Sequence, residues 1–328
     1  MDAAPIPVLV LFGPTASGKT GILLELFSSV NGIHAEVVSA DSMQVYRGMD
    51  IGTAKPSVQE RARLPHHLID IRSPSQQFNV GDFVRLADEA CLQISGRGNL
   101  PVVSGGTGFY LKNFIMGLSE APPCDMKIRA ALKWELVERG AAALMEELAA
   151  CDPASAQRIH INDEYRLMRA LEVFRSCGRP LSSFETSAKE RAPFRFIIIG
   201  LSRPREELYR RINLRCAQMF QRGLAEEVRS LYEAGFTPND PGLRAIGYRE
   251  FFVEDLVKDQ EEPRKWRFSK DTDGVQALVA QNSRRYAKRQ LTFFAGACRN
   301  IPGVIWIECG RDEAETSARI REELEKVL

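Results

Sequence analysis

Paired cysteines, long apolar runs and a basic amino-terminal stretch are all missing from this sequence of 328 residues. The seven cysteines are scattered singly, with no CxxC pair and an odd total, which argues against a disulfide framework and against a zinc site. No apolar run approaches the roughly 20 residues that a membrane helix needs. Residues 1–7 contain no lysine or arginine, so they lack the basic start of a secretory signal. We therefore expect a cytoplasmic protein with reduced thiols and no membrane segment.

An excess of charge of either sign is missing as well. The formal net charge is +1, which neither indicates nor excludes a nucleic-acid partner, because the local clustering of charge decides that question. Hydrophobic residues make up 44% and charged residues 27% of the chain, and both values are typical of a globular protein. A chain of this length can bury the core of one large domain or of two smaller ones.

Strand and helix patterns alternate in the first third of the chain. A continuous apolar run at residues 8–12 is typical of a buried parallel strand, and helical spacing follows over residues 19–29. Further strands are expected at residues 35–40 and 101–104, with a helical pattern at residues 83–94 between them. This order predicts an α/β fold, a P-loop NTPase-like parallel sheet with helices on both faces.

A different pattern, helical throughout, begins after Pro122 and Pro123. Its helical segments are residues 126–139, 141–150 and 164–177. Strand patterns return at residues 194–199 and 303–309, whereas residues 255–274 are charged, poor in apolar side chains and expected to form a surface loop. The predicted domains are a P-loop core in two parts, residues 1–121 and 191–328, and a helical insertion domain at residues 122–190.

Residues 13–20 match the phosphate-binding pattern GxxxxGK[ST] in full and lie between a predicted strand and a predicted helix. Glycines let the backbone curl so that successive N–H groups face phosphate oxygens, and the positive end of the helix dipole adds to the attraction. Lys19 contributes a cation, and the Thr20 hydroxyl can coordinate Mg²⁺ bound to the same phosphates. The pattern predicts a phosphate or diphosphate ligand without identifying the compound. The predicted binding residues are Gly13, Pro14, Thr15, Ala16, Ser17, Gly18, Lys19 and Thr20.

Polar residues also follow two other predicted strands, at the edge where parallel sheets bind their ligands. Asp41 ends the second strand and has two functional interpretations, a Mg²⁺ ligand as in P-loop ATPases or a general base, besides that of a helix or turn cap. Residues 104–108 follow the third strand. Their glycines allow the close approach of a ligand, and Thr107 supplies a hydroxyl group.

Taken in order, short motifs along the chain resemble those of the bacterial tRNA dimethylallyltransferases, a family of P-loop tRNA isopentenyltransferases. The resemblance spans about residues 8–295, and the strings at residues 41–46 and 48–56 are far more specific than the phosphate loop. The motifs are residues 13–20, 41–46, 48–56, 65–70, 105–107, 244–249 and 286–290.

The resemblance implies transfer of a dimethylallyl group from dimethylallyl diphosphate to N6 of the adenosine at tRNA position 37, next to the anticodon, with release of diphosphate. The phosphate loop would then bind the donor's diphosphate in place of ATP, with Mg²⁺ as the cofactor. By the family pattern Asp41 accepts a proton from N6, Thr107 positions the acceptor, and Arg215 neutralises the leaving group. Arg211 is expected to bind the diphosphate as well.

Basic residues gather near the end of the chain, where residues 281–299 contain no Asp or Glu. On a helix such residues form a solvated face or, beside the other motifs, a surface for tRNA phosphates. The resemblance further implies that the insertion domain grips the anticodon stem-loop and that the target adenosine leaves its stack. Where the family commonly has an aromatic residue followed by arginine, this chain has Phe294 and Ala295, so a basic contact is expected to be missing. The expected tRNA-binding residues are Asp41, Ser42, Met43, Gln44, Thr107, Arg129, Tyr165, Arg166, Arg169, Arg244, Gly247, Tyr248, Arg249, Arg284, Arg285, Lys288 and Arg289.

Three other activities stay open at this point. A small-molecule P-loop kinase would use Asp41 as base and Arg211 and Arg215 as lid arginines, but it leaves the motifs at residues 41–46 and 48–56 unexplained. A nucleotide-dependent RNA-binding module would carry out no covalent chemistry. An adenine-nucleotide isopentenyltransferase would transfer the same group to free nucleotides. Nothing in the sequence requires more than a monomer.

Overall fold

The computed structural model describes residues 4–28, 32–184, 191, 193–255, 265–297, 301, 303–310 and 312–327. The chain divides into two compact units. The first comprises Met1–Ile115 and Glu190–Leu328, and the second is Met116–Lys189. In the sequence, the second unit is therefore inserted between the two parts of the first.

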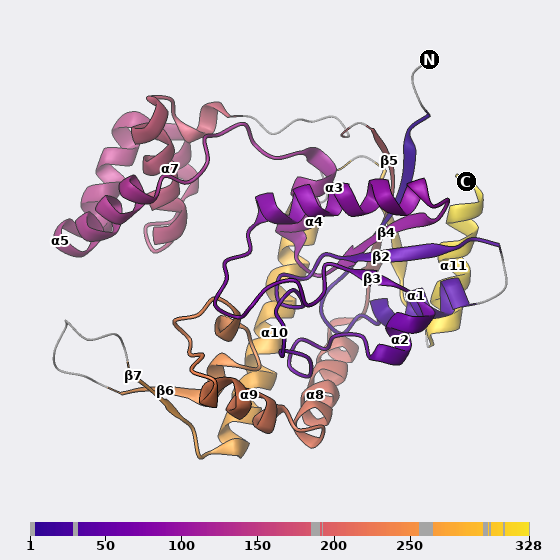
Figure 1. Cartoon of the computed structure of the whole chain (residues 1–328). Coiled ribbons are helices and arrows are strands. Elements are labelled where there is room, and N and C mark those ends of the chain that lie inside the picture. The colour runs from indigo at the N-terminus through magenta and orange to yellow at the C-terminus, as the bar shows by residue number, and fades with distance from the viewer. Residues whose placement is uncertain are drawn as a thin grey trace. The chain divides into compact units, whose positions relative to one another are not determined.

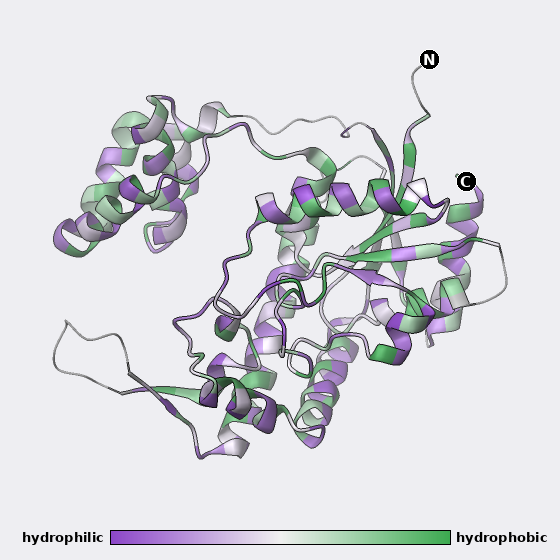
Figure 2. Cartoon of the chain, viewed as in Figure 1, coloured by the Kyte–Doolittle hydropathy of each residue, from purple (hydrophilic) through white to green (hydrophobic). Residues whose placement is uncertain are grey.

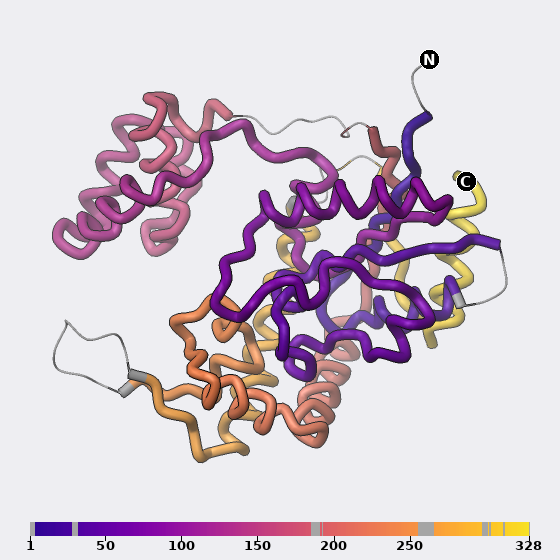
Figure 3. The backbone as a smooth tube through the Cα atoms, viewed as in Figure 1, coloured from indigo at the N-terminus to yellow at the C-terminus, as the bar shows by residue number. Residues whose placement is uncertain are grey.

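A parallel six-stranded sheet forms the centre of the first unit, which confirms the predicted fold class (Figure 1). The strands are β1 (Ile6–Phe12), β2 (Ala35–Ser39), β3 (His66–His67), β4 (Leu100–Gly105), β5 (Phe194–Ser202) and β8 (Ile305–Glu308). Their order across the sheet is β3-β2-β4-β1-β5-β8. β5 follows the insertion in the sequence, yet it pairs with β1 along its length, and the two run side by side in Figure 3.

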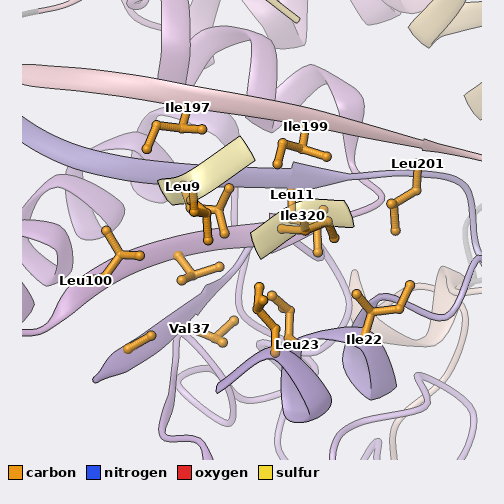
Figure 4. Close-up of a cluster of buried hydrophobic side chains, with 14 of the residues drawn as sticks. Leu9, Leu11, Ile22, Leu23, Val37, Leu100, Ile197, Ile199, Leu201 and Ile320 are labelled. Atoms are coloured by element: carbon orange, nitrogen blue, oxygen red, sulfur yellow. The ribbon is translucent and has the colours of Figure 1, made fainter. Parts of the chain in front are cut away.

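Helices pack on both faces of this sheet. The helices of the first unit are α1 (Lys19–Ser28), α2 (Val58–Arg63), α3 (Val80–Gly96), α4 (Gly108–Met116), α8 (Arg205–Gln221), α9 (Leu224–Glu233), α10 (Thr272–Ala297) and α11 (Glu313–Glu325). On one face, Leu9 of β1 belongs to a buried cluster with Ile22 of α1 and Ile320 of α11 (Figure 4). On the other face, the Phe114 ring of α4 lies 5.5 Å from the Phe196 ring of β5. Burial of apolar area on both faces stabilises the sheet and fixes the positions of its loops.

The outer faces of these helices are hydrophilic. In Figure 2, hydrophilic and hydrophobic residues alternate along α3, whose buried side holds Phe83, Ala87 and Ile94. Throughout the described part of the chain, every helix is too short or too polar to cross a bilayer.

The second unit is helical, with a small core of its own. Its elements are α5 (Met126–Cys151), α6 (Pro153–Arg158), α7 (Glu164–Cys177) and the 3-10 turn η1 (Leu181–Ser183). Gly140 has a φ of 77° within α5 and interrupts the helix between the two segments that the sequence pattern separates. Leu132, Leu144 and Leu167 are fully buried together between α5 and α7. This packing lets the unit bury an apolar face without help from the sheet.

A two-stranded antiparallel ribbon occupies part of the region, residues 255–274, that was predicted to be a surface loop. It consists of β6 (Phe252–Asp255) and β7 (Lys265–Phe268), and residues 256–264 between them lie outside the described residues. The Phe268 ring contacts the rings of Phe251 and Tyr232 at 5.5 and 5.9 Å. Partial burial of the alternate aromatic side chains Trp266 and Phe268 therefore makes β7 a strand despite its charged neighbours.

Candidate active site

The phosphate loop leaves β1 and enters α1, as the sequence pattern requires. Gly18 has a φ of 100°, and Ala16 has a φ of 63°, a left-handed value that costs energy for a residue with a side chain. The Ser17 N–H donates to the Pro14 carbonyl at 3.2 Å and closes the turn. The first N–H groups of α1 have no partner within the helix and point toward the space in front of the loop. This arrangement is suited to an anion.

Lys19 folds back over the same loop. Its Nζ donates to the carbonyls of Gly13 at 2.9 Å and of Pro14 at 3.0 Å. Burial lowers the pKa of Lys19 to about 8, although the nearby Asp41 carboxylate opposes this effect. The pKa of Lys19 therefore lies close to physiological pH, and a bound anion would favour the charged form of the lysine.

We expect diphosphate binding to weaken as the pH rises through about 8, where the Lys19 ammonium loses its proton. The affinity for inorganic diphosphate should fall up to about tenfold per pH unit above this value, because only the charged lysine attracts the anion. Calorimetric titrations at several pH values measure the effect. Lys19→Arg, which stays charged throughout, should remove the decline. An identical decline in both proteins would contradict this assignment.

Arginines of α8 surround the loop. The Arg211 Nε donates to the Ala16 carbonyl at 2.9 Å, and the Arg215 Nη2 donates to the Thr15 hydroxyl at 2.6 Å. The Arg215 Nε is buried and has no hydrogen-bond partner among the residues that the structure describes, and burial lowers the pKa of its guanidinium group. A buried, unsatisfied cationic donor beside a phosphate loop is suited to an anionic ligand.

A third arginine, Arg203, was missed in the sequence. It is 6% exposed, and its Nε donates to the Ser17 carbonyl at 3.2 Å while Nη1 donates to Glu207 at 2.5 Å. The available signal was its position immediately after β5, at the same edge of the sheet as the phosphate loop.

The loops that follow β2 and β4 are joined to each other. The Asp41 Oδ1 accepts the Met43 N–H at 2.8 Å, and the Thr107 hydroxyl accepts the Ser42 N–H at 3.1 Å. A side chain at Gly105 would place its Cβ 2.1 Å from the Ala40 carbonyl oxygen, so only glycine fits there. Because β4 lies between β2 and β1, these loops and the phosphate loop adjoin at one edge of the sheet.

Tyr286 of α10 lies near Asp41 and Thr107, at the same edge of the sheet. Burial, and next to it the Asp41 carboxylate, raise the pKa of its phenol to about 12, whereas the nearby Thr107 and Gln290 side chains oppose this rise. Tyr286 is thus a neutral hydrogen-bonding group beside the carboxylate at physiological pH. The sequence marked this residue only as an aromatic in a basic helix.

The distinctive motifs at residues 41–46, 48–56 and 65–70 hold one another in place. Lys55 is nearly buried, and its Nζ donates to the Tyr46 carbonyl at 2.6 Å, to Asp50 at 2.6 Å and to Asp70 at 2.5 Å. A desolvated lysine with three oxygen partners fixes the loops strongly. The motifs therefore build the support of the site, next to the loop that carries Asp41.

The adjacent histidines, His66 and His67, each take part in a hydrogen bond. The His66 Nδ1 lies 2.7 Å from the Leu64 carbonyl oxygen, and the His67 Nε2 lies 2.7 Å from Glu36. Within the described ranges, no group of three or more His, Cys, Asp or Glu side chains could hold a metal ion.

Glu227 of α9 accepts hydrogen bonds from the backbone of the 48–56 motif and so holds the motif in place. Its carboxylate accepts the N–H groups of Asp50 at 2.9 Å, Ile51 at 2.8 Å and Gly52 at 3.2 Å. It also accepts the Tyr248 hydroxyl at 2.6 Å. Tyr248 is fully buried, so its side chain cannot contact tRNA in this structure, contrary to the expectation from the motif. Its role is to hold this loop.

We expect Glu227→Gln to destabilise the fold. The amide nitrogen of glutamine would face backbone N–H donors, so the free energy of unfolding should fall by about 2 kcal/mol or more. Denaturant unfolding measures the change. Glu226→Gln, at an exposed position of the same helical turn, is the matched control and should have little effect. Equal stability of the two variants would contradict the role assigned to Glu227.

The basic residues predicted to bind tRNA differ in their exposure and in their hydrogen bonds to other parts of the protein. On α10, Arg285, Lys288 and Arg289 are exposed, whereas the Arg284 Nη1 donates to Asn213 at 2.5 Å. Near α10 in the first unit, Arg244 and Arg249 are exposed, and Arg244 donates to the carbonyls of Pro238 and Asn239. Gly247 is buried, with a φ of 96°. The predicted contacts to tRNA remain predictions.

Two of the four predicted tRNA-binding residues of the second unit point to a buried carboxylate. Arg129 and Arg169 lie 3.4 and 3.5 Å from the fully buried Glu172. Tyr165 is 69% exposed, with the Arg129 guanidinium 4.9 Å from its ring centre, and the Arg166 side chain is 71% exposed. Tyr165 and Arg166 are therefore the most exposed residues of this set.

A strand, a GxxxxGK[ST] loop and a helix, with a lysine and arginines around the loop, define a protein of the P-loop class. The sequence profile described as IPP transferase matches residues 44–297, most of the chain. This protein belongs to the IPP transferase family, as its motifs predict.

Relatives of known name are similar in sequence to this protein over nearly the whole chain. The tRNA dimethylallyltransferase of Geobacter sulfurreducens is 44% identical over 302 residues, which cover 92% of this chain and 91% of that protein. The tRNA dimethylallyltransferase of Geobacillus kaustophilus is 42% identical over 316 residues, or 96% of this chain and 94% of that protein.

Solved structures are similar as well. The tRNA isopentenylpyrophosphate transferase of Bacillus halodurans is 36% identical with a TM-score of 0.64, and the match covers 98% of this chain and 97% of that one. A eukaryotic dimethylallyltransferase acting on tRNA is 25% identical with a TM-score of 0.76, covering 97% of this chain and 77% of that one.

Proposed function

We propose that this protein is a tRNA dimethylallyltransferase that transfers the dimethylallyl group of dimethylallyl diphosphate to N6 of the adenosine at position 37 of tRNA. One observation supports this most strongly: Asp41, Thr107 and the phosphate loop follow three adjacent parallel strands in a chain whose relatives carry this name. An anion cradle beside a carboxylate suits a reaction in which an anion leaves and an amine attacks.

The donor side of the site stabilises the leaving group. The bond between the allylic carbon and the diphosphate oxygen breaks, and the oxygen keeps the electron pair. Backbone N–H groups of the phosphate loop, Lys19, Arg211 and Arg215 stabilise the charge that develops on the diphosphate. Such charge stabilisation is the main requirement of this step, because an allylic carbon loses diphosphate readily once the departing charge is neutralised.

The acceptor side supplies the nucleophile. The N6 amino group of adenosine forms the new bond to the allylic carbon, and its surplus proton passes to the Asp41 carboxylate. Thr107 and Tyr286 adjoin this carboxylate and orient the acceptor. The adenosine reaches them after leaving the anticodon-loop stack.

Magnesium fits this site as an ion held mainly by the substrate. Thr20 stands at the position of the P-loop hydroxyl that ligates Mg²⁺, and the described residues contain no acidic cluster that would hold the ion alone. When bound, Mg²⁺ would neutralise diphosphate charge. The protein's contribution is to place the Thr20 hydroxyl beside the phosphate-binding amides.

Exposed basic side chains account for tRNA binding in this proposal. Arg285, Lys288 and Arg289 on α10 are suited to phosphate contacts, and Tyr165 and Arg166 of the helical unit are suited to the anticodon stem-loop. These contacts position the RNA, while the side chains around Asp41 select the base.

A transfer assay tests the proposed function. Purified protein, Mg²⁺ and labelled dimethylallyl diphosphate are mixed with unmodified tRNA or with AMP, and ATP is tested in parallel as an alternative to the labelled donor. We expect label in tRNA alone. Label in AMP would support a nucleotide isopentenyltransferase, and ATP hydrolysis without transfer of label would contradict the proposal.

A further inference from the structure

Gln290 of α10 bridges the two halves of the site. Its side chain is 5% exposed, and its amide oxygen accepts the Thr15 N–H of the phosphate loop at 2.9 Å. The amide nitrogen donates to the Gly106 carbonyl at 2.8 Å, in the loop that carries Thr107. One carboxamide thus spans the loop for the donor and the loop for the acceptor, which lie far apart in the sequence.

The surroundings of Gln290 are built to hold this bridge. A Cβ at Gly106 would lie 2.5 Å from the Gln290 Nε2, so glycine is required for the contact. One turn before Gln290, Tyr286 lies beside Asp41 and Thr107, and one turn after it the Phe294 ring lies 4.9 Å from that of Phe12 in β1. The helix is therefore anchored on both sides of the carboxamide.

We infer that Gln290 is a positioning residue for the transfer, which fixes the phosphate loop relative to the acceptor loop and so sets the alignment of donor and amine. This inference rests on the proposed function. The Thr15 amide is occupied by Gln290, so the loop is held in its anion-binding shape from outside, by a group that does not itself contact the diphosphate. Alignment of two reactants contributes to rate through kcat, because it lowers the cost of reaching a reactive geometry.

The same helix carries the exposed cations. Arg285, Lys288 and Arg289 lie on its outer side, within a turn or two of Gln290. RNA phosphates bound there would therefore contact the element that holds both loops. Loss of Gln290 is expected to reduce kcat and diphosphate affinity while leaving the KM for tRNA unchanged.

Two variants separate this role from general damage to the fold. Gln290→Leu keeps the volume but loses both hydrogen bonds, and Gln290→Glu can reproduce them only when its carboxyl group is protonated, as an O–H donor to Gly106 and a C=O acceptor for Thr15. Gln281→Leu and Gln281→Glu, at an exposed position of the same helix, are the matched controls.

The first measurement is the affinity for inorganic diphosphate with Mg²⁺, by calorimetry from about pH 6 to about pH 8.5, a range that brackets the raised pKa of a buried carboxyl group. We expect Gln290→Leu to bind about 10- to 100-fold more weakly at every pH, because two buried polar groups lose their partners. Gln290→Glu should be as weak at high pH and should recover toward the unaltered protein as the pH falls. A constant ratio between Gln290→Glu and the unaltered protein, or equal losses in the Gln281 variants, would overturn the inference.

The second measurement is the transfer assay on the same proteins. We expect kcat to follow the same order and the same pH-dependent recovery, with an unchanged KM for tRNA. If the unaltered protein transfers no label, the proposed function fails, whereas the diphosphate titrations still decide whether Gln290 holds the loop. If the unaltered protein is active and the Gln290 variants match it, the inference alone fails.

Discussion

Asp41→Asn is expected to lower kcat for transfer to tRNA by about 10²- to 10⁴-fold, the range typical of a lost general base. Asparagine keeps the oxygen that accepts the Met43 N–H at 2.8 Å, so the loop should retain its shape. It cannot take up the proton from N6. Single-turnover transfer with saturating tRNA and donor measures the loss without a contribution from binding.

Binding measurements show whether this loss is chemical. We expect the affinities for tRNA and for diphosphate to change little in Asp41→Asn, because neither the basic face of α10 nor the phosphate loop is altered. Asp273→Asn, at an exposed position of α10, is the control and should be fully active. A nearly normal kcat in Asp41→Asn would show that another group takes the proton.

Lys19→Met is expected to reduce kcat/KM for dimethylallyl diphosphate by about 10²-fold or more, comparable to the loss of one preorganised donor to a developing anion. The Lys19 Nζ lies within 3.0 Å of two loop carbonyls and close to any anion in the loop. Methionine keeps the length of the aliphatic stem, so the fold should survive. Steady-state kinetics with varied donor measures the effect.

The control for this variant is Lys326→Met, which removes a surface lysine paired with Glu323. It should leave kcat/KM unchanged, since exposed ion pairs contribute little. Thermal unfolding of Lys19→Met should resemble that of the unaltered protein, which separates a loss of binding from a loss of folding. A donor KM and kcat close to normal would contradict a role of Lys19 at the diphosphate.

The fold was predictable because its signals are local. The apolar run of β1, the glycine-rich turn and the helical spacing of α1 lie next to one another in the sequence, so propensity and pattern agree. The same holds for α7, predicted and observed at residues 164–177. β7 was missed because the partial burial of Trp266 and Phe268 depends on tertiary partners such as Tyr232, and charged neighbours concealed its pattern.

The candidate site was predictable only in part, because some of its residues are brought together by tertiary packing and carry no local signal. Residues 13–20 and Asp41 are read from motifs that follow strands. The support of the site comes from distant parts of the chain: Arg203 from the end of β5, Glu227 from α9 and Gln290 from α10. No spacing rule links Gln290 to Thr15, and only the packing of α10 against the sheet brings them together. Tyr248 was predicted to bind tRNA, but its side chain is buried and donates to Glu227, and its motif does not indicate which way the side chain points.

The central claim is that the phosphate loop holds the diphosphate of a prenyl donor while Asp41 meets an amino group of RNA. A crystal structure of the protein with an anticodon stem-loop and a non-reactive thio analogue of dimethylallyl diphosphate tests it directly. The account predicts the diphosphate in the loop at residues 13–20 and N6 of an extruded adenosine within hydrogen-bond distance of the Asp41 carboxylate. An adenosine that stays stacked in the RNA, with the diphosphate bound elsewhere or displaced by the triphosphate of added ATP, would contradict it.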